Sequence, residues 1–121
     1  MIEAKVLPRK IIENPNSCPI THAMNIIGGK WKPIILFLLS RGSLRFGKLI
    51  MFMPAISRKV LTDQLRELEA DGMILREKFA ETPPRVQYSL TKKSEELVPL
   101  LWNLAKWTAK NTPEMEFMSF E

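Results

Sequence analysis

The chain has 121 residues with 18 Lys or Arg against 13 Asp or Glu, so its formal net charge at neutral pH is +5. This length has room for one core, and a content of 45% hydrophobic residues is too high for a disordered chain. The single Cys excludes an intramolecular disulfide, and one Cys with one His excludes a zinc site of the usual composition.

Membrane and secretory segments are not expected. The longest strictly apolar run, residues 34–39, is far shorter than the ~20 residues that span a bilayer. The first residues also lack a basic stretch followed by an apolar one, which is the pattern of a secretory signal. We therefore expect a cytoplasmic protein with no membrane partner.

The positive charge is concentrated in the first half of the chain. Residues 1–62 carry ten basic and two acidic side chains, a net charge of +8, whereas residues 63–121 carry eight basic and eleven acidic ones, a net charge of −3. No acidic side chain occurs between Asn14 and Thr62. A surface of one sign favours a polyanion such as nucleic acid, and the alternative is a solvated basic face.

The N-terminal part is predicted to be an extended arm followed by two helices. Residues 1–17 mix short apolar pairs with proline and asparagine, which indicates an arm. Residues 18–29 are predicted to contain a short helix with Pro19 at its first position and Cys18 at the N-cap. A second helix is expected over residues 31–40, and we expect it to be buried because it is apolar nearly all round.

Residues 47–71 have the pattern of two helices separated by a tight turn. A short extended link leads into a brief helix over residues 47–53, which Pro54 stops. Ser57 is expected to cap a second helix over residues 58–71. The leucines at helical spacing on this second helix, which predict one buried face, are Leu61, Leu65 and Leu68.

The remainder of the chain predicts a hairpin and a long helix. Alternation over residues 73–80 and 85–90, with a Pro pair between them, predicts two antiparallel strands. Thr91 is expected to cap a helix that extends to about residue 111 and is apolar on more than one face, so part of its surface needs a second partner. The predicted division is therefore an arm (1–17), one domain (18–111) and a C-terminal tail (112–121).

This order of elements is that of a winged helix-turn-helix, an α+β and mainly α fold with a two-stranded β-hairpin as the wing. In such folds the second helix of the pair enters the major groove of DNA, and the hairpin reaches the flanking backbone. The helix over residues 58–71 would be the recognition helix. Its start is cationic, and its acids Glu67, Glu69 and Asp71 lie toward the far end.

Several motifs occur in the order found in a known family. Together they resemble the HxlR-type regulators, small winged-helix transcription factors of bacteria and archaea that are related to the MarR type, and the resemblance covers residues 18–107. It implies a homodimer, with dimerisation elements at the N- and C-terminal ends of the domain and two recognition helices set for an inverted-repeat operator in double-stranded DNA. The motifs are Cys18-Pro19, Ile27-Gly28-Gly29-Lys30-Trp31, Arg45-Phe46, residues 56–72 and Pro83-Pro84-Arg85-Val86.

The candidate DNA contacts are polar and cationic groups near the recognition helix and on the hairpin. Arg58 and Thr62 are candidates for base edges, with contact to phosphate alone as the alternative. Arg85 at the base of the wing is a candidate for the minor groove or a phosphate, and the others are candidates for phosphates. For Arg85 the alternative is a structural pairing with Glu77 or Glu81, and any one of the lysines could be plain solvated charge. The full set is Lys32, Arg45, Lys48, Ser57, Arg58, Lys59, Thr62, Arg66, Lys78 and Arg85.

Cys18 suggests a redox or electrophile response, because a helix N-terminus favours the thiolate and some members of the resembled family sense oxidants near this Cys-Pro position. Three alternatives stay open: a capping residue that does not react, a regulator that answers a small-molecule effector with Cys18 silent, and a winged-helix module for protein contact. We expect no enzyme, no cofactor and no metal site, since the sequence has neither a Gly-rich phosphate loop nor a nucleophile set that its single His completes.

Overall fold

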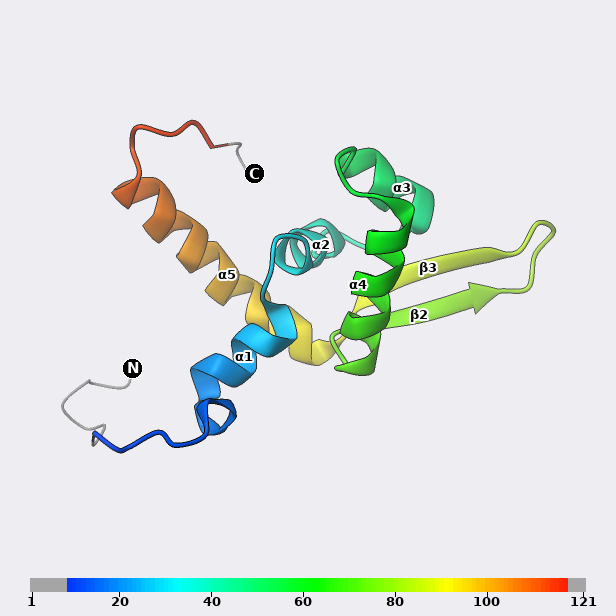
Figure 1. The fold of residues 1–121 in the computed structure, drawn as a ribbon. Coiled ribbons are helices and arrows are strands. Elements are labelled where there is room, and N and C mark those ends of the chain that lie inside the picture. The colour runs from blue at the N-terminus through cyan, green and yellow to red at the C-terminus, as the bar shows by residue number, and fades with distance from the viewer. Residues whose placement is uncertain (1–8, 118–121) are drawn as a thin grey trace.

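The computed structural model describes residues 9–117, and Figure 1 shows the arrangement of their elements. The α+β, mainly α prediction of a winged helix-turn-helix is confirmed. The arm and the tail lie partly outside the described residues, so the predicted division into 1–17, 18–111 and 112–121 stays a prediction. The elements are the 3-10 turn η2 (Pro15–Ser17), the helices α1 (Pro19–Ile27), α2 (Lys32–Leu39), α3 (Phe46–Phe52), α4 (Arg58–Ala70) and α5 (Lys92–Asn111), and the strands β1 (Leu44–Arg45), β2 (Ile74–Phe79) and β3 (Arg85–Leu90).

The helix starts follow the capping residues that the sequence predicts. In α4 the Ser57 hydroxyl oxygen accepts a hydrogen bond from the Val60 backbone N–H at 3.0 Å. In α5 Thr91 and Ser94 form a reciprocal capping box, in which each side chain bonds the other residue's backbone N–H. These caps fix where the recognition helix and the last helix begin.

The sheet has one more strand than the predicted hairpin. β1 pairs antiparallel with β3, so that the order is β1-β3-β2 and Leu44 stands opposite Tyr88. A strand of two residues is too short to show an alternation of polar and apolar side chains, which is why the sequence indicated only an extended link. The β2–β3 hairpin projects away from the helices and forms the wing (Figure 1).

The core lies between α2, α4 and the sheet. The predicted leucine face of α4 is buried, with 0% exposure at Leu61 and Leu68, and it packs in one apolar cluster with Ile35 and Leu36 of the buried helix α2. Burial of this apolar surface is the main force that holds α4 against the domain. The opposite face of α4 is left free to meet a partner.

The end of the molecule away from the wing exposes apolar side chains. In Figure 1 α1 and α5 lie on the opposite side of α2 from the β2–β3 hairpin, and α5 extends outward from the core. Ile20 of α1 is 72% exposed, and Trp107 of α5 is 62% exposed. Exposed apolar residues on two neighbouring elements indicate a contact surface, in agreement with the surplus apolar surface predicted for the last helix.

Candidate nucleic-acid interface

The start of α4 is a rigid platform for polar and cationic side chains. The Arg58 guanidinium lies over the ring of Phe46 from α3, with 5.5 Å between its central carbon and the ring centroid. The Thr62 hydroxyl donates a hydrogen bond to the backbone carbonyl oxygen of Arg58 at 2.8 Å. The structure therefore brings Ser57, Arg58 and Thr62 together on one exposed end of α4, next to α3.

Two further cations of α4 lie at the surface. Lys59 is highly exposed and forms an ion pair with Asp63, one turn further along, with 2.8 Å between Nζ and Oδ2. Pairs of this kind on exposed helix faces stabilise by only about 0.3–0.5 kcal/mol, so a phosphate can replace the carboxylate at little cost. Arg66 is exposed and makes no ion pair with another described residue.

Lys32 has a different position from the one that the sequence suggested. Its side chain is buried, and its Nζ lies 2.6 Å from Oε1 of Glu67 on α4. A buried ammonium needs its counter-charge, and Lys32 would have to leave Glu67 to reach a phosphate. We therefore remove Lys32 from the candidate contacts; it connects α2 to the recognition helix instead.

The wing holds three cations, of which Arg76 and Lys78 are exposed and form no ion pair with another described residue, whereas Arg85 is paired. Lys78 of β2 is exposed, whereas the Arg85 guanidinium lies 4.2 Å above the ring of Phe79 and pairs with Glu81 at 2.9 Å. The structural alternative for Arg85, an ion pair with one of two glutamates, is thus present, and the partner is Glu81. This pair would have to open before Arg85 could contact DNA.

Arg45 and Lys48 lie beside the helix pair. Arg45 is the N-cap of α3 and belongs to β1, where it stands opposite Gln87, and its side chain is exposed. Lys48 is exposed on α3 itself. Both cations are therefore available at the surface on the α3 side of the recognition helix.

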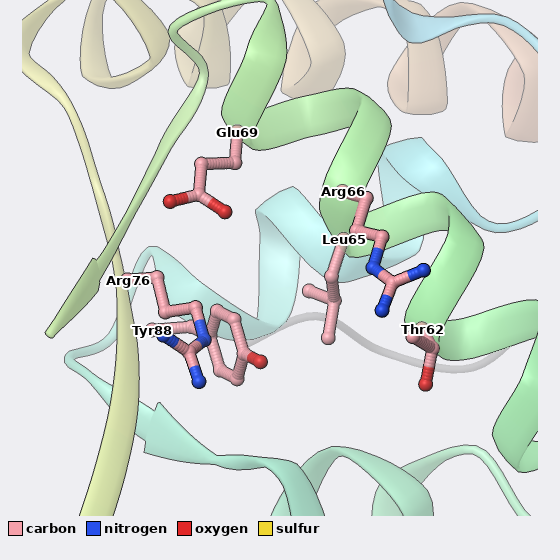
Figure 2. A pocket seen from close by; sticks show the side chains of 6 residues that line it. All are labelled: Thr62, Leu65, Arg66, Glu69, Arg76 and Tyr88. Carbon is pink, nitrogen blue, oxygen red and sulfur yellow. The ribbon is translucent and has the colours of Figure 1, made fainter. Parts of the chain in front are cut away.

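A hollow of about 360 Å³ lies between α4 and the sheet, and Figure 2 shows the side chains that line it. The sequence did not predict that Arg76 and Tyr88 of the strands line this hollow. The two residues stand opposite each other across β2 and β3. The sequence shows the alternation of residues along each strand, but it does not show that α4 packs over the face of the sheet that carries Arg76 and Tyr88. The lining residues are Thr62, Leu65, Arg66, Glu69, Arg76 and Tyr88.

Cys18 is the N-cap of α1, as predicted, and it is a partly exposed free cysteine. Its thiol makes no capping hydrogen bond, but the backbone N–H groups of Thr21 and, to a smaller extent, Ile20 lower the pKa of the thiol. A larger fraction of the Cys18 thiol is therefore deprotonated at neutral pH than in an ordinary cysteine.

Residues 9–117 contain neither a candidate metal site nor a candidate membrane span. No three His, Cys, Asp or Glu side chains in this part of the chain gather in a way that could hold a metal ion. None of its helices is both long and apolar enough to cross a membrane.

The fold, with cations exposed at the start of α4, is that of a winged helix-turn-helix protein. The chain belongs to the HxlR-like helix-turn-helix family, whose model matches residues 26–116. The HTH-type transcriptional regulator YybR of Bacillus subtilis (strain 168) is 38% identical over 108 residues, which cover 89% of this chain and 86% of YybR. These proteins are transcriptional regulators, not enzymes, and so is this chain.

Two solved structures show the same fold at substantial identity. The redox regulator HypR in its oxidised form has a TM-score of 0.73 and 40% identity, and the match covers 78% of this chain and 97% of HypR. The diamide-treated form of YodB from B. subtilis has a TM-score of 0.68 and 32% identity, with 77% of this chain and 93% of YodB covered.

Proposed function

We propose that the protein is a dimeric, cytoplasmic transcription regulator that binds a specific inverted-repeat sequence in double-stranded DNA. The observation that carries this proposal is the start of α4, where polar and cationic side chains are exposed on a helix that the core holds rigidly. The major groove of B-DNA is wide enough to admit a helix, and base edges are read there by side chains near the helix start.

The positions of the side chains suggest which of them contact bases and which contact phosphates. In this proposal Arg58 and Thr62 contact base edges, since Arg pairs with the O6 and N7 atoms of guanine. Most other contacts would go to phosphates, which set the register of the protein on the duplex. The proposed phosphate contacts are Arg45 and Lys48 beside α3, Ser57, Lys59 and Arg66 on α4, and Lys78 on the wing, with Arg85 joining them if its pair with Glu81 opens.

Dimerisation is supported by the apolar residues exposed on α1 and α5. Leu104 and Trp107 stand one turn of α5 apart and are 55% and 62% exposed, and Ile20 of α1 adds a third apolar side chain. A second copy of the chain would cover this surface, because a twofold interface uses the same patch on both subunits. Two recognition helices would then address the two halves of an inverted repeat.

The proposed DNA contact predicts a specific effect of Arg58→Ala. A duplex selected from a random pool by the wild-type protein should bind Arg58→Ala at least about 30-fold more weakly, because loss of a base-reading arginine costs about 1–3 kcal/mol and the proposed dimer loses one from each subunit. The discrimination among bases at one position in each half-site should relax at the same time. Fluorescence anisotropy with labelled duplexes measures both quantities.

Lys110→Ala is the matched control, since it removes one exposed positive charge at the far end of α5. Its affinity for the selected duplex should stay close to that of the wild type. If Arg58→Ala and Lys110→Ala lose the same small amount of affinity, Arg58 does not read DNA.

A redox response through Cys18 forms the second part of the proposal. It is supported by the lowered pKa of the thiol and by the similarity to HypR, which is named a redox regulator, and to YodB in its diamide-treated form. Oxidation or alkylation at the start of α1 would alter the proposed dimer surface and thereby the spacing of the two recognition helices.

Cys18→Ser should abolish the response to diamide. The wild-type protein should lose or change its operator affinity after treatment with diamide or a quinone, whereas the serine variant should bind DNA equally well with and without the reagent. Because the pKa of Cys18 is lowered, its alkylation by iodoacetamide near neutral pH should be faster than that of an ordinary exposed thiol. A serine variant that still responds to diamide would show that Cys18 does not carry the redox response. This result would favour the alternative of a regulator that responds to a small ligand.

A further inference from the structure

The C-terminal end of α4 meets the start of α5 (Figure 1). The Thr91 hydroxyl, at the N-cap of α5, donates a hydrogen bond to the backbone carbonyl oxygen of Gly72 at 2.8 Å. The Lys93 ammonium donates one to the backbone carbonyl oxygen of Asp71, the C-cap of α4, at 2.6 Å. These four residues form a polar connection between the two helices, which we call the α4–α5 joint.

The joint is suited to hold α4 at a fixed angle. The charge of Lys93 is favourable at the C-terminus of α4, where the helix dipole is negative. The Thr91 hydroxyl serves both helices, since its oxygen also accepts the backbone N–H of Ser94 within the α5 cap. Burial of the leucine face attaches α4 to the domain without a preferred direction, whereas hydrogen bonds require a defined geometry. The joint therefore adds orientation to attachment.

A second connection leads from α4 to α5 through α2. Glu67 of α4 pairs with the buried Lys32 of α2. Further along α2, Phe37 meets Trp102 of α5 edge to face, with 5.7 Å between the ring centroids. Both connections hold the C-terminal half of α4, and both end on α5, which carries part of the proposed dimer surface. The proposed base contacts lie at the other end of α4.

We infer that the α4–α5 joint sets the spacing of the two half-sites that the dimer reads, an inference that rests on the proposed function. Thr91 and Lys93 are its positioning residues. The 13 residues of α4 span about 20 Å. A rotation of about 10° at the joint therefore moves the DNA-reading end by about 3.5 Å, close to the rise of about 3.4 Å per base pair. A small change of angle is enough to alter the preferred spacing by one base pair.

The test uses duplexes that carry two selected half-sites with one base pair more or fewer between them, and anisotropy measures the preference of each variant. Thr91→Asp keeps an acceptor for the α5 cap but has no proton to donate to Gly72, and Lys93→Met removes the contact to Asp71. Both joint variants should reduce the wild-type preference for one spacing by at least about threefold, as the loss of one hydrogen bond implies. Thr91→Ser, which keeps the hydroxyl, should retain that preference.

Lys92→Met is the matched control. Lys92 is exposed at the first position of α5, next to Lys93, so both methionine variants lose one positive charge from the same turn. Lys92→Met should keep the wild-type preference for one spacing. If Lys92→Met and Lys93→Met reduce this preference equally, or if Thr91→Asp retains it, the joint does not set the spacing.

Hydrogen exchange of the free protein tests the joint without DNA. The backbone N–H groups of Asp71, Gly72 and Met73 bond to carbonyl oxygens of α4 and close its last turn. They should exchange severalfold faster in both joint variants than in the wild type or the control. Unchanged exchange would overturn the inference even if no duplex is bound. Faster exchange in the joint variants, together with no binding to any DNA, would support the joint and refute the proposed function.

Discussion

Leu61→Ala is expected to lower the free energy of unfolding by about 3 kcal/mol and, with it, the affinity for DNA. Leu61 lies on the buried face of α4 with 0% exposure, in the cluster that joins α4 to α2. Truncation removes the transfer free energy of the side chain and leaves a cavity, and together these effects cost about 2–5 kcal/mol for a buried leucine. The affected cavity would lie directly beneath the proposed recognition helix.

Urea denaturation followed by circular dichroism measures this loss, with Val60→Ala as the matched control. Val60 is the preceding residue on the same helix but is 37% exposed, so its truncation should have a much smaller effect. If the protein is an obligate dimer, both variants must be compared at one protein concentration. Equal losses in the two variants would mean that the Leu61 face does not hold α4 on the domain.

Local signals in the sequence were sufficient for most of the fold. Ser57 and Thr91 are capping residues next to periodic apolar patterns, and both helices begin where these residues predict. The leucine spacing on α4 likewise identified the face that is buried. These features depend on residues within a few positions of one another, so a single chain reveals them.

The predictions that missed depended on contacts between distant residues. Lys32 looked like one more surface cation, but it pairs with Glu67, 35 positions later. β1 is recognisable only through its pairing with β3, where Leu44 meets Tyr88. The sequence does not show which surfaces these long-range contacts cover, and the hollow beside Arg76 was missed for the same reason.

The second prediction with a large expected effect is the dependence of operator affinity on salt concentration. If at least three of the exposed cations of each protomer neutralise phosphates, a dimer neutralises six or more, and raising salt from about 50 to 200 mM should weaken operator binding by about a thousandfold or more, because each contact releases condensed counterions. The exposed cations that supply these contacts in the proposal are Arg45, Lys48, Lys59, Arg66 and Lys78.

The same titration separates DNA binding from the alternative of a winged-helix module for protein contact. A contact made mainly through apolar surface changes little over this range of salt, since charges at such an interface contribute a small part of the affinity. Arg66→Ala should reduce the slope of log affinity against log salt by about two units, because it removes one phosphate contact from each protomer of the dimer. Lys110→Ala should leave that slope unchanged, because its charge lies outside the proposed interface.

The most direct test of the account is therefore the salt dependence of binding to a duplex selected by the wild-type protein, measured beside a duplex of scrambled sequence. The account predicts a steep, linear decrease in log affinity with log salt for both duplexes, with the selected one bound at least a thousandfold more tightly at physiological salt. Equal affinities for the two duplexes, or a binding constant that does not respond to salt, would contradict a regulator that reads DNA through α4.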